Sequence, residues 1–266
     1  MKRLDQMTLA EAEAAMAATD IVFLPQGPTE GHGNHMPLGC DWYIATAAAM
    51  LLAERTGGIC LPPVTYNFAG ATAGYKPTIQ IPPSLQMELT RAMVRELWNT
   101  GFRRIFCVSV HGPNGCSIGE ALRELWQWER IPAMMLNPYH RVDMDKWAAR
   151  IPNFDDAFKE ACMSYGAMKL LGWEDLIPDS TALEDLYAAE QGRDMPEVVA
   201  RALSFGRVGY HYTDDLQHQP PRSGLGADIG IEMIEEAVTN LEGAMDAMAD
   251  YLEYLEQTGH LAPSEH

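Results

Sequence analysis

The sequence has little positive charge. Its 266 residues include 19 lysines and arginines against 37 aspartates and glutamates, which leaves a formal net charge of −18 at pH 7. A nucleic-acid partner would need basic side chains to neutralise its phosphates, and an anionic membrane surface would repel this chain for the same reason. We therefore expect no nucleic-acid partner and no membrane partner, and we interpret the acidic charge as a source of solubility.

Cysteine and long apolar runs are also scarce. The cysteines are odd in number and form no C-x-x-C pair: Cys40, Cys60, Cys107, Cys116 and Cys162. This pattern is typical of reduced thiols in a cytosol and not of a disulfide framework. Acidic side chains interrupt the first eighteen residues, and no run of 18 apolar residues occurs anywhere. These features predict a cytoplasmic protein without a signal peptide or a transmembrane helix.

Apolar residues make up 47% of the sequence and are spread along it, which predicts one globular domain over residues 1–266. Short apolar runs predict buried strands at Ile21–Leu24, Ile59–Val64, Ile105–Val110 and Ala133–Leu136, and Thr78–Ile81 alternates like an edge strand. Helical patterns separate these runs, at residues 8–18, 41–54, 84–101 and 116–129. Further on, helices are predicted at Phe154–Leu171, Pro196–Leu203 and Ile229–Leu255, with a long loop at 210–226. Strands that alternate with helices predict an α/β fold with a mostly parallel sheet.

Potential metal ligands follow two of the predicted strands. Glu30 and His32 lie in the loop after Ile21–Leu24, and His111 directly follows Ile105–Val110. Because parallel strands end at the same edge of a sheet, where loops gather polar groups, we expect these side chains to lie close together. Asp41 opens the next helix, where a carboxylate is favoured and can also bridge two cations.

Histidines and carboxylates, with no cysteine required, are the ligand set of a hydrolytic Zn²⁺, Mn²⁺ or Fe²⁺ site. Glu30 and His32 are two residues apart, so in extended backbone they point to the same side. In the alternative interpretation, Asp41 is only a helix N-cap and His111 only a polar residue at a strand end. The expected convergence of all four side chains on one edge of the sheet favours the metal site.

The stretch Thr29–Asp41, which reads TEGHGNHMPLGCD, resembles the creatininase-family signature T-E-x-H-G-x-H-L-P-L-x-T-D. Gly101–Ile105, followed by Ser109–Asn114, resembles the second family block, G-F-x-x-I followed by N-G-H-G-G-N. Tyr75–Ile79 resembles the family strand entry F-P-G-T-I. The resemblance is dense over about residues 20–130 and weak afterwards.

The resemblance implies a three-layer α/β/α sandwich that assembles as a homohexamer and holds two divalent metals. Glu30, Asp41 and His111 would hold one metal, and His32 and Asp41 the other, with Asp41 bridging. The metals implied are Zn²⁺ and/or Mn²⁺, or alternatively Fe²⁺, at one or two per subunit.

The sequence departs from the family at several positions. Pro113 stands where creatininase itself has a glutamate that completes the second metal site. Lys159–Ala167 is the best counterpart of a later block, H-A-G-E-x-E-T, and there Glu160 replaces a catalytic histidine and Tyr165 a glutamate. Two further substitutions are Ser109 for asparagine and Cys40 for threonine.

These positions give the predicted roles. Glu160 is the candidate catalytic residue that carries protons, with a solvated helix residue as the alternative. His35 and Asn114 are predicted to bind the small-molecule substrate or to support the metal ligands.

Three functions stay open at this point. The first is a hydrolase in which activated water opens the C–N bond of a small cyclic amide. The second uses the same site to open a C–C bond in a cyclic diketone derived from an inositol-type polyol. The third is a non-catalytic metal-binding assembly protein on the same fold.

Overall fold

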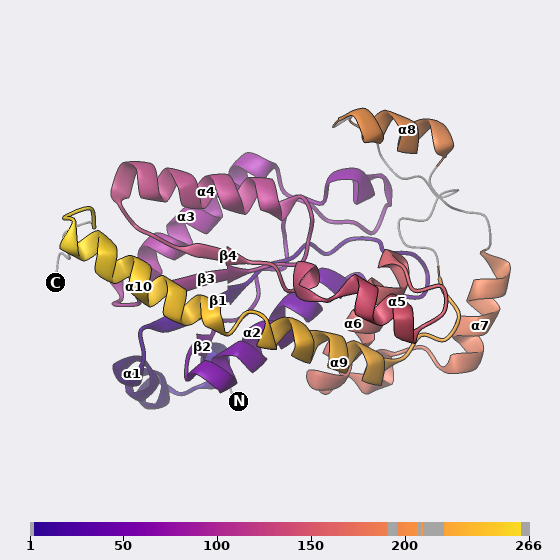
Figure 1. Ribbon diagram of the computed structural model, residues 1–266, viewed down its shortest axis with the longest axis horizontal. Coiled ribbons are helices and arrows are strands. Elements are labelled where there is room, and N and C mark those ends of the chain that lie inside the picture. The colour runs from indigo at the N-terminus through magenta and orange to yellow at the C-terminus, as the bar shows by residue number, and fades with distance from the viewer. Residues whose placement is uncertain (1–2, 191–195, 207–208, 210–220, 262–266) are drawn as a thin grey trace.

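A sheet of four short parallel strands lies at the centre of the computed structural model (Figure 1), which describes residues 3–190, 196–206, 209 and 221–261. The strands are β1 (Ile21–Pro25), β2 (Ile59–Cys60), β3 (Arg104–Val108) and β4 (Met134–Leu136), in the order β2-β1-β3-β4. In the register of the central pair, Val22 lies beside Ile105 and Phe23 beside Phe106. The predicted parallel sheet is confirmed.

The helices and the 3₁₀ turns surround this sheet. They are α1 (Leu9–Ala18), α2 (Cys40–Thr56), α3 (Pro83–Asn99), α4 (Asn114–Glu129), α5 (Met144–Arg150), α6 (Asp156–Leu170), α7 (Ser180–Ala189), α8 (Glu197–Phe205), α9 (Ala227–Thr239) and α10 (Gly243–Gln257), with turns η1 (Leu4–Gln6), η2 (Gly70–Gly74), η3 (Pro138–Arg141) and η4 (Glu174–Leu176).

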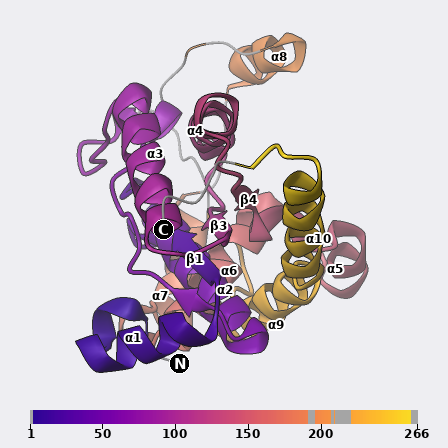
Figure 2. The same ribbon diagram turned by 90° about the vertical axis from the view of Figure 1, so that its left-hand side faces the viewer.

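The side chains of the strands alternate between two apolar cores. Phe23 and Phe106, whose rings stack at 5.4 Å, belong to the core under α2, α6 and α9. Val22 and Ile105 point the other way, into the core under α3 and α4. Figure 2 shows these two helical layers on opposite sides of the strands. The three-layer α/β/α sandwich is therefore confirmed.

Close packing of α6 against α9 fixes the helix that carries Glu160. Gly166 of α6 and Gly230 of α9 lie at the crossing, where the two backbones touch. A Cβ atom on Gly230 would lie 1.7 Å from the carbonyl oxygen of Cys162, so no larger residue fits. The glycine pair thus allows α6 to approach closely enough to reach the carboxyl edge of the sheet.

Three sequence-based predictions need correction. The strand predicted at Ile59–Val64 ends at Cys60, and the one at Thr78–Ile81 is only an isolated antiparallel bridge between Thr29 and Ile79. The single helix predicted at Ile229–Leu255 is wrong, because α9 ends at Thr239 and α10 begins at Gly243. At this break, Asn240 donates a hydrogen bond to the carbonyl of Arg141, and Leu241 is buried in the core. Most of the predicted loop 210–226 lies outside the described residues.

Within the described part of the chain, no helix has both the length and the apolar character that crossing a membrane requires.

Candidate metal centre

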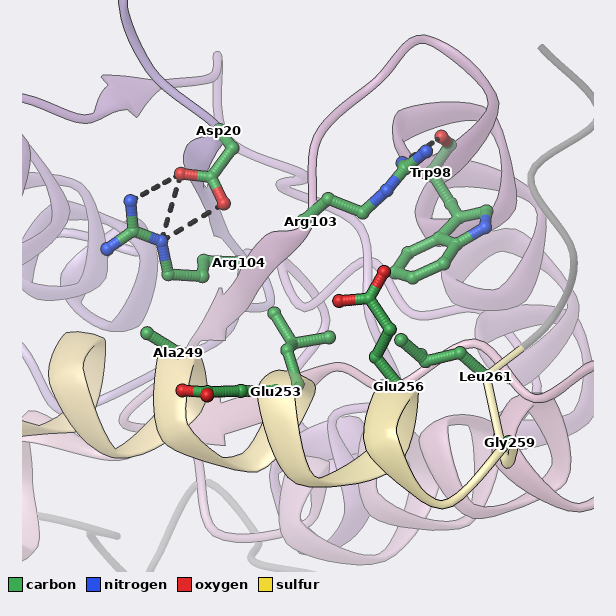
Figure 3. A pocket seen from close by; sticks show the side chains of 10 residues that line it. Asp20, Trp98, Arg103, Arg104, Ala249, Glu253, Glu256, Gly259 and Leu261 are labelled. Atoms are coloured by element: carbon green, nitrogen blue, oxygen red, sulfur yellow. Dashed lines mark hydrogen bonds and ion pairs between the residues drawn. The ribbon is translucent and has the colours of Figure 1, made fainter.

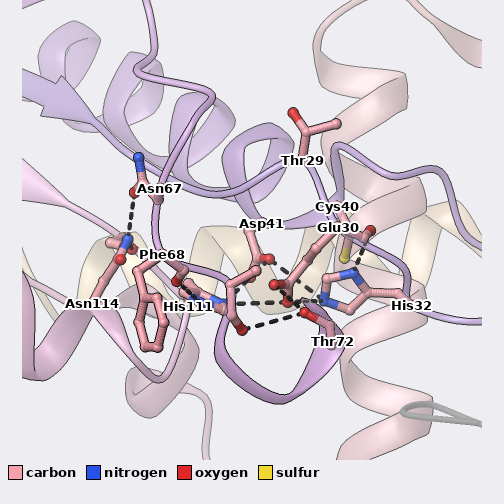
Figure 4. Close-up of polar contacts among 12 residues, drawn as sticks. Thr29, Glu30, His32, Cys40, Asp41, Asn67, Phe68, Thr72, His111 and Asn114 are labelled. Carbon is pink, nitrogen blue, oxygen red and sulfur yellow. Dashed lines mark hydrogen bonds and ion pairs between the residues drawn. The ribbon is translucent and has the colours of Figure 1, made fainter. Parts of the chain in front are cut away.

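Polar side chains from separate parts of the sequence meet at the carboxyl ends of β1 and β3 (Figure 4). Glu30 and His32 come from the loop after β1, Asp41 from the first turn of α2, and His111 from the segment after β3. Glu160 reaches the same point from α6. We call these residues the carboxylate–histidine cluster. All of them are buried, although Glu160, at 8% exposure, is less so than the others.

His32 presents one ring nitrogen to three carboxylates. Its Nε2 lies 3.6 Å from Oε1 of Glu30, 3.5 Å from Oδ2 of Asp41 and 3.6 Å from Oε1 of Glu160. Its Nδ1 donates a hydrogen bond of 3.3 Å to the backbone carbonyl of Glu30. In the neutral ring this bond puts the proton on Nδ1, so the lone pair of Nε2 faces the carboxylates.

His111 faces the cluster from the other side with its Nδ1. This atom lies 3.4 Å from Oε1 of Glu30 and 3.6 Å from Oδ2 of Asp41. Its Nε2 donates a 2.9 Å hydrogen bond to the carbonyl oxygen of Phe68, which fixes the proton on Nε2. A backbone carbonyl that accepts from the far nitrogen is a usual way in which a metal-binding histidine is oriented.

The distances and one orphaned atom fit a cation. Ligand atoms held about 2.0–2.2 Å from one tetrahedral ion lie roughly 3.3–3.6 Å apart, and the nitrogen–oxygen separations here run from 3.4 to 3.6 Å. Oδ2 of Asp41 is buried and accepts no hydrogen bond from any described residue, although it faces both imidazoles. A buried carboxylate oxygen without a donor is costly unless a cation binds it. Glu30, His32 and Asp41 together form a candidate metal-binding group.

Thr72 supports the cluster and was missed by the sequence analysis. Its hydroxyl, on η2, donates a 2.6 Å hydrogen bond to Oε2 of Glu30. Oε1 of Glu30 is therefore the oxygen turned toward the two histidines. No local sequence signal connects Thr72 with a residue 42 positions earlier.

The electrostatics of the cluster also favour a bound cation. Burial raises the pKa of the Glu30 carboxyl well above its usual range; the Thr72 hydroxyl opposes the rise and Glu160 adds to it. Burial, with help from Glu30 and Glu160, raises the pKa of Asp41 well above its usual range. Burial lowers the pKa of His32 to about 4, so at neutral pH this ring offers no positive charge. A divalent cation would supply the charge that these carboxylates lack.

Cys40 lies at the edge of the cluster, next to Asp41. The thiol is buried, and its sulfur, a nitrogen of His32 and a carboxylate oxygen of Glu160 all lie within 4.8 Å of one another. Burial raises the pKa of this thiol well above its ordinary value, and the carboxylates of Glu160 and Asp41 add to the shift. In the sequence, Cys40 stands out only as a substitution for the threonine of the family signature.

The imidazole ring of His35 is buried at the cluster without a hydrogen bond from the described residues. Its side chain is 2% exposed, and neither ring nitrogen has a hydrogen-bond partner among the described residues. Burial, with the nearby His32 and Arg222, lowers its pKa to about 4, so the ring is neutral at physiological pH. Tyr165 holds the backbone here by donating a 2.7 Å hydrogen bond to the carbonyl of His35. Two unsatisfied nitrogens in a buried ring point to a ligand or water, and the predicted role in substrate binding stays a prediction.

Asn114 lies beneath the cluster in a buried amide network. Its amide nitrogen donates to Oδ1 of Asn67 at 2.7 Å and to Oγ of Ser109 at 2.9 Å, and its oxygen accepts from Gln86 at 2.6 Å. Gln86 in turn accepts a hydrogen bond from the backbone nitrogen of Phe68, the residue whose carbonyl orients His111. These contacts support a positioning role for Asn114, and the predicted role in substrate binding stays a prediction.

A separate cavity of about 700 Å³ lies at the opposite end of the sheet (Figure 3). Asp20 and Arg104, which form an ion pair, line it together with α10 residues such as Glu253. Ligands of parallel α/β sheets bind at the carboxyl ends of strands, and this cavity adjoins the amino ends of β1 and β3 and contains no residue of the cluster.

A family model for creatininase, described as creatinine amidohydrolase, matches residues 5–202. The chain belongs to the creatininase family. The matched residues include the whole carboxylate–histidine cluster.

Curated relatives match the chain over part of its length. A 3-dehydro-scyllo-inosose hydrolase from Thermotoga maritima is 26% identical over 147 residues, 54% of this chain and 47% of the relative. A creatinine amidohydrolase from Pseudomonas putida is 32% identical over 130 residues, 45% of this chain and 50% of the relative. A mycofactocin precursor peptide peptidase from Mycolicibacterium smegmatis is 34% identical over 100 residues, 35% of this chain and 40% of the relative. The chain thus spans about half the length, or less, of the curated relatives it matches.

Solved creatininases share the fold over nearly the whole chain. A crystal structure of creatinine amidohydrolase superposes with a TM-score of 0.71 at 22% identity, covering 91% of this chain and 95% of the other. A structure described as creatininase Mn gives a TM-score of 0.69 at 22% identity, covering 92% and 98%. A creatininase mutant of the Zn-Zn type gives 0.71 at 21% identity, with the same coverage. At these identities the likeness concerns the fold.

Proposed function

We propose that this chain is a metal-dependent hydrolase that opens a small cyclic substrate at the C–N bond of a cyclic amide. The observation that carries the proposal is the buried Oδ2 of Asp41, which has no hydrogen-bond donor and faces ring nitrogens of both His32 and His111. The names of two relatives support the bond type, because creatinine amidohydrolase and a precursor peptide peptidase both cleave amides.

The cluster divides into two cation positions that share Asp41. Glu30, Asp41 and His111 would hold the first. Nδ1 of His111 lies 3.4 Å from Oε1 of Glu30 and 3.6 Å from Oδ2 of Asp41. His32, Asp41 and Glu160 form the second, at 3.5 and 3.6 Å from the histidine nitrogen. We propose Zn²⁺ and/or Mn²⁺ as the metals, which agrees with the solved manganese and Zn-Zn forms of creatininases.

Bound at this cluster, a divalent cation supplies Lewis-acid activation of water and of the scissile carbonyl. The residues of the chain hold and orient the reactants. His32 and His111 keep their lone pairs on the cluster because backbone carbonyls hold their other nitrogens. His35 offers buried ring nitrogens for a hydrogen bond to the substrate.

We propose that Glu160 moves a proton to the leaving amine. Its Oε1 faces His32 at 3.6 Å, and its side chain, 10% exposed, is more accessible than those of Glu30 and Asp41 at 1%. Glu160 would therefore both help to hold the second cation and carry the proton to the leaving amine. With these two roles, Glu160 would stand in for two groups of the family. One is the glutamate whose position is occupied here by Pro113, and the other is the catalytic histidine.

The proposal is tested by metal analysis of the purified protein and by a hydrolysis screen of lactams, cyclic imides and cyclic ureas. We expect ring opening that a chelator abolishes and that Zn²⁺ or Mn²⁺ restores. An Asp246→Asn variant, altered on the exposed face of α10, is the control for a mutation outside the cluster and should behave like the wild type. Full metal content without cleavage of any cyclic amide would contradict the proposed bond.

A second candidate is the opening of a C–C bond in a cyclic diketone derived from an inositol-type polyol. The observation that favours it is the match to the 3-dehydro-scyllo-inosose hydrolase, which extends over 54% of this chain. This substrate has no leaving amine, so proton transfer would be to carbon. The same screen, extended to cyclic diketones, separates the two: ring opening of the diketone without amide cleavage would establish the second candidate.

The third candidate, a non-catalytic metal-binding assembly protein, would bind metal and cleave neither class of substrate.

For all three candidates we propose a closed homo-oligomer, a hexamer. The proposal rests on the family resemblance and on the exposed apolar side chains of α8, where Val198 is 76% and Phe205 86% exposed. Light scattering at micromolar concentration tests this assembly, and a monomer would contradict it.

A further inference from the structure

Cys40 is the sulfur donor nearest to the cluster and has no role in the proposed hydrolysis. It begins α2 immediately before Asp41, and its side chain is buried. Figure 4 shows its sulfur beside the ring of His32. Sulfur, a histidine nitrogen and an oxygen of Glu160 lie within 4.8 Å of one another, so small side-chain adjustments would bring all three onto one ion.

The contacts of the thiol leave it available for such an ion. Its hydrogen bond to Sδ of Met36 spans 4.0 Å, and a thioether sulfur is a weak acceptor; its other side-chain partner is the hydroxyl of Ser164. The neighbouring Asp41 independently points to a cation at the same place. Its Oδ2 is buried, accepts no hydrogen bond from the described residues and lies 3.5 Å from Nε2 of His32.

We propose that Cys40 is a ligand of the second cation position, together with His32 and Glu160. This position then has nitrogen, oxygen and sulfur donors, and it prefers Zn²⁺ or Co²⁺ to Mn²⁺ because a thiolate is a soft ligand. When the sulfur–metal bond forms, the thiol proton leaves to the solvent. The inference rests on the proposed function, since it requires a cation at the cluster.

The preference distinguishes this chain from the signature that it resembles. The signature has threonine at the position of Cys40, and a neutral hydroxyl binds Zn²⁺ far less strongly than a thiolate does. Pro113 removes a carboxylate from the second position, and Glu160 and Cys40 together restore its donor number. A carboxylate–histidine position is thereby converted into one that includes sulfur.

Cobalt spectroscopy tests the ligand directly. The full-length protein is stripped with a chelator and titrated with Co²⁺, whose bond to a thiolate gives an intense charge-transfer band in the near ultraviolet. We expect the band in the wild type and its loss in Cys40→Ser. Cys107→Ser is the matched control, because Cys107 is also fully buried but lies on β3 in the core under α3 and α4, and it should retain the band.

Metal competition gives a second readout. After dialysis against equal Zn²⁺ and Mn²⁺, the wild type should retain mostly Zn²⁺ at the second position. In Cys40→Thr the bound Zn²⁺:Mn²⁺ ratio should fall more than about tenfold, since loss of even an outer partner of a ligand reduces affinity by about 10–100-fold.

The wild-type spectrum decides the matter even if the variants do not fold. Wild-type protein that binds Co²⁺, seen by its visible bands, but lacks the thiolate band would overturn the role of Cys40. Cyclic-amide hydrolysis in that same protein would leave the proposed function intact. A thiolate band lost in Cys40→Ser, in a protein that cleaves nothing, would instead support Cys40 as a ligand and contradict the hydrolase.

Discussion

Thr72 and Glu30, 42 residues apart in the sequence, are joined by a 2.6 Å hydrogen bond from the threonine hydroxyl to Oε2 of the carboxylate. Both side chains are buried. The bond fixes the rotation of the carboxylate, so that Oε1 faces His32 at 3.6 Å and His111 at 3.4 Å. A residue on a 3₁₀ turn thereby determines which oxygen of Glu30 is presented to the cluster.

Thr72→Val should weaken metal binding while it preserves the fold. Valine has nearly the same shape but no hydroxyl, so Glu30 loses its orienting donor and metal affinity should fall about 10–100-fold. Competition with a metallochromic chelator measures the change. Thr56→Val, which removes a hydroxyl that donates to the Leu52 carbonyl within α2, is the control and should keep its affinity. Equal affinities in both variants would show that Thr72 does not orient the ligand.

Asp41→Asn should lose both cations, because the proposed positions share this carboxylate. Asparagine keeps the size of the side chain but removes the charge that lies between His32 and His111 at 3.5 and 3.6 Å. Elemental analysis should find a loss of metal well beyond that in Glu30→Gln or Glu160→Gln, each of which alters one position. Full metal content in Asp41→Asn would refute the bridging role.

Glu160→Gln should reduce turnover by about 10²–10⁴-fold, the usual contribution of a general acid or base. The amide keeps the shape of the side chain but cannot accept a proton. If Oε1 also binds the second cation, as its 3.6 Å distance from His32 Nε2 suggests, one metal equivalent should be lost and the other kept. Asp156→Asn, in the first turn of the same helix with its side chain 72% exposed, is the control.

The outcomes separate the two roles of Glu160. A fall in turnover with full metal content would support the role of Glu160 in proton transfer and contradict its role as a metal ligand. A loss of one metal, with turnover nearly normal once the variant is reloaded at high metal concentration, would support the role of Glu160 as a ligand and contradict its role in proton transfer. Normal turnover with normal metal content would contradict both roles.

Two roles of Asn114, positioning of the cluster and binding of substrate, are distinguished by measuring both the free energy of unfolding and KM. Asn114→Ala removes hydrogen bonds to Gln86, Asn67 and Ser109 from a buried network, and each lost bond should lower the free energy of unfolding by about 0.5–1.5 kcal/mol, although Gln86 still donates to Asn67. Gln86→Met, which removes a different member of the network, should have the same effect. If Asn114 instead binds substrate, its variant alone should raise KM with little loss of stability.

The sequence predicted those parts of the site that depend on short-range patterns. β1 and β3 are apolar runs, and the predicted ligands Glu30, His32 and His111 follow them closely, so their meeting at one edge follows from a parallel sheet. Asp41 was predicted because it opens a helix. The family signature independently covers the same positions.

The remaining parts depend on contacts between distant segments. Thr72 lies in an irregular stretch and reaches Glu30 only through the turn η2. Glu160 reaches the cluster because Gly166 and Gly230 allow α6 and α9 to touch, and no pattern in the sequence pairs these glycines. The break between α9 and α10 has no proline, and it depends on the burial of Leu241 and the bond from Asn240 to Arg141.

The stability of the metal-free protein should depend on pH through the buried carboxyls. Burial raises the pKa of Glu30 and of Asp41 in the fold. The stabilisation that Glu30 and Asp41 contribute is therefore fully present below the pKa of these carboxyls in the unfolded chain, about 4. It is lost as the pH rises through the raised pKa of the folded state, because the buried groups must then become charged.

The histidines have the opposite dependence. Burial lowers the pKa of His32 and of His35 to about 4, so their contribution is present above the ordinary value of 6.5 and is lost as the pH falls toward 4. Thiols and tyrosines ionise in the unfolded chain only above about pH 8.5. Between about pH 6.5 and 8.5 the contributions of His32 and His35 are complete, so of these four buried groups only Glu30 and Asp41 would still change the stability.

Denaturant unfolding of chelator-treated protein across that window should show a free energy of unfolding that falls as the pH rises. The slope is at most about 1.4 kcal/mol per pH unit for each carboxyl that remains protonated in the fold. Asp41→Asn removes one of these groups and should flatten the profile. Saturating Zn²⁺ should reverse it, because metal binding requires deprotonated ligands and strengthens as the pH rises. A flat profile in the metal-free wild type would show that Glu30 and Asp41 do not remain protonated in the fold over this range. An unchanged slope in Asp41→Asn would assign the dependence to groups outside the cluster.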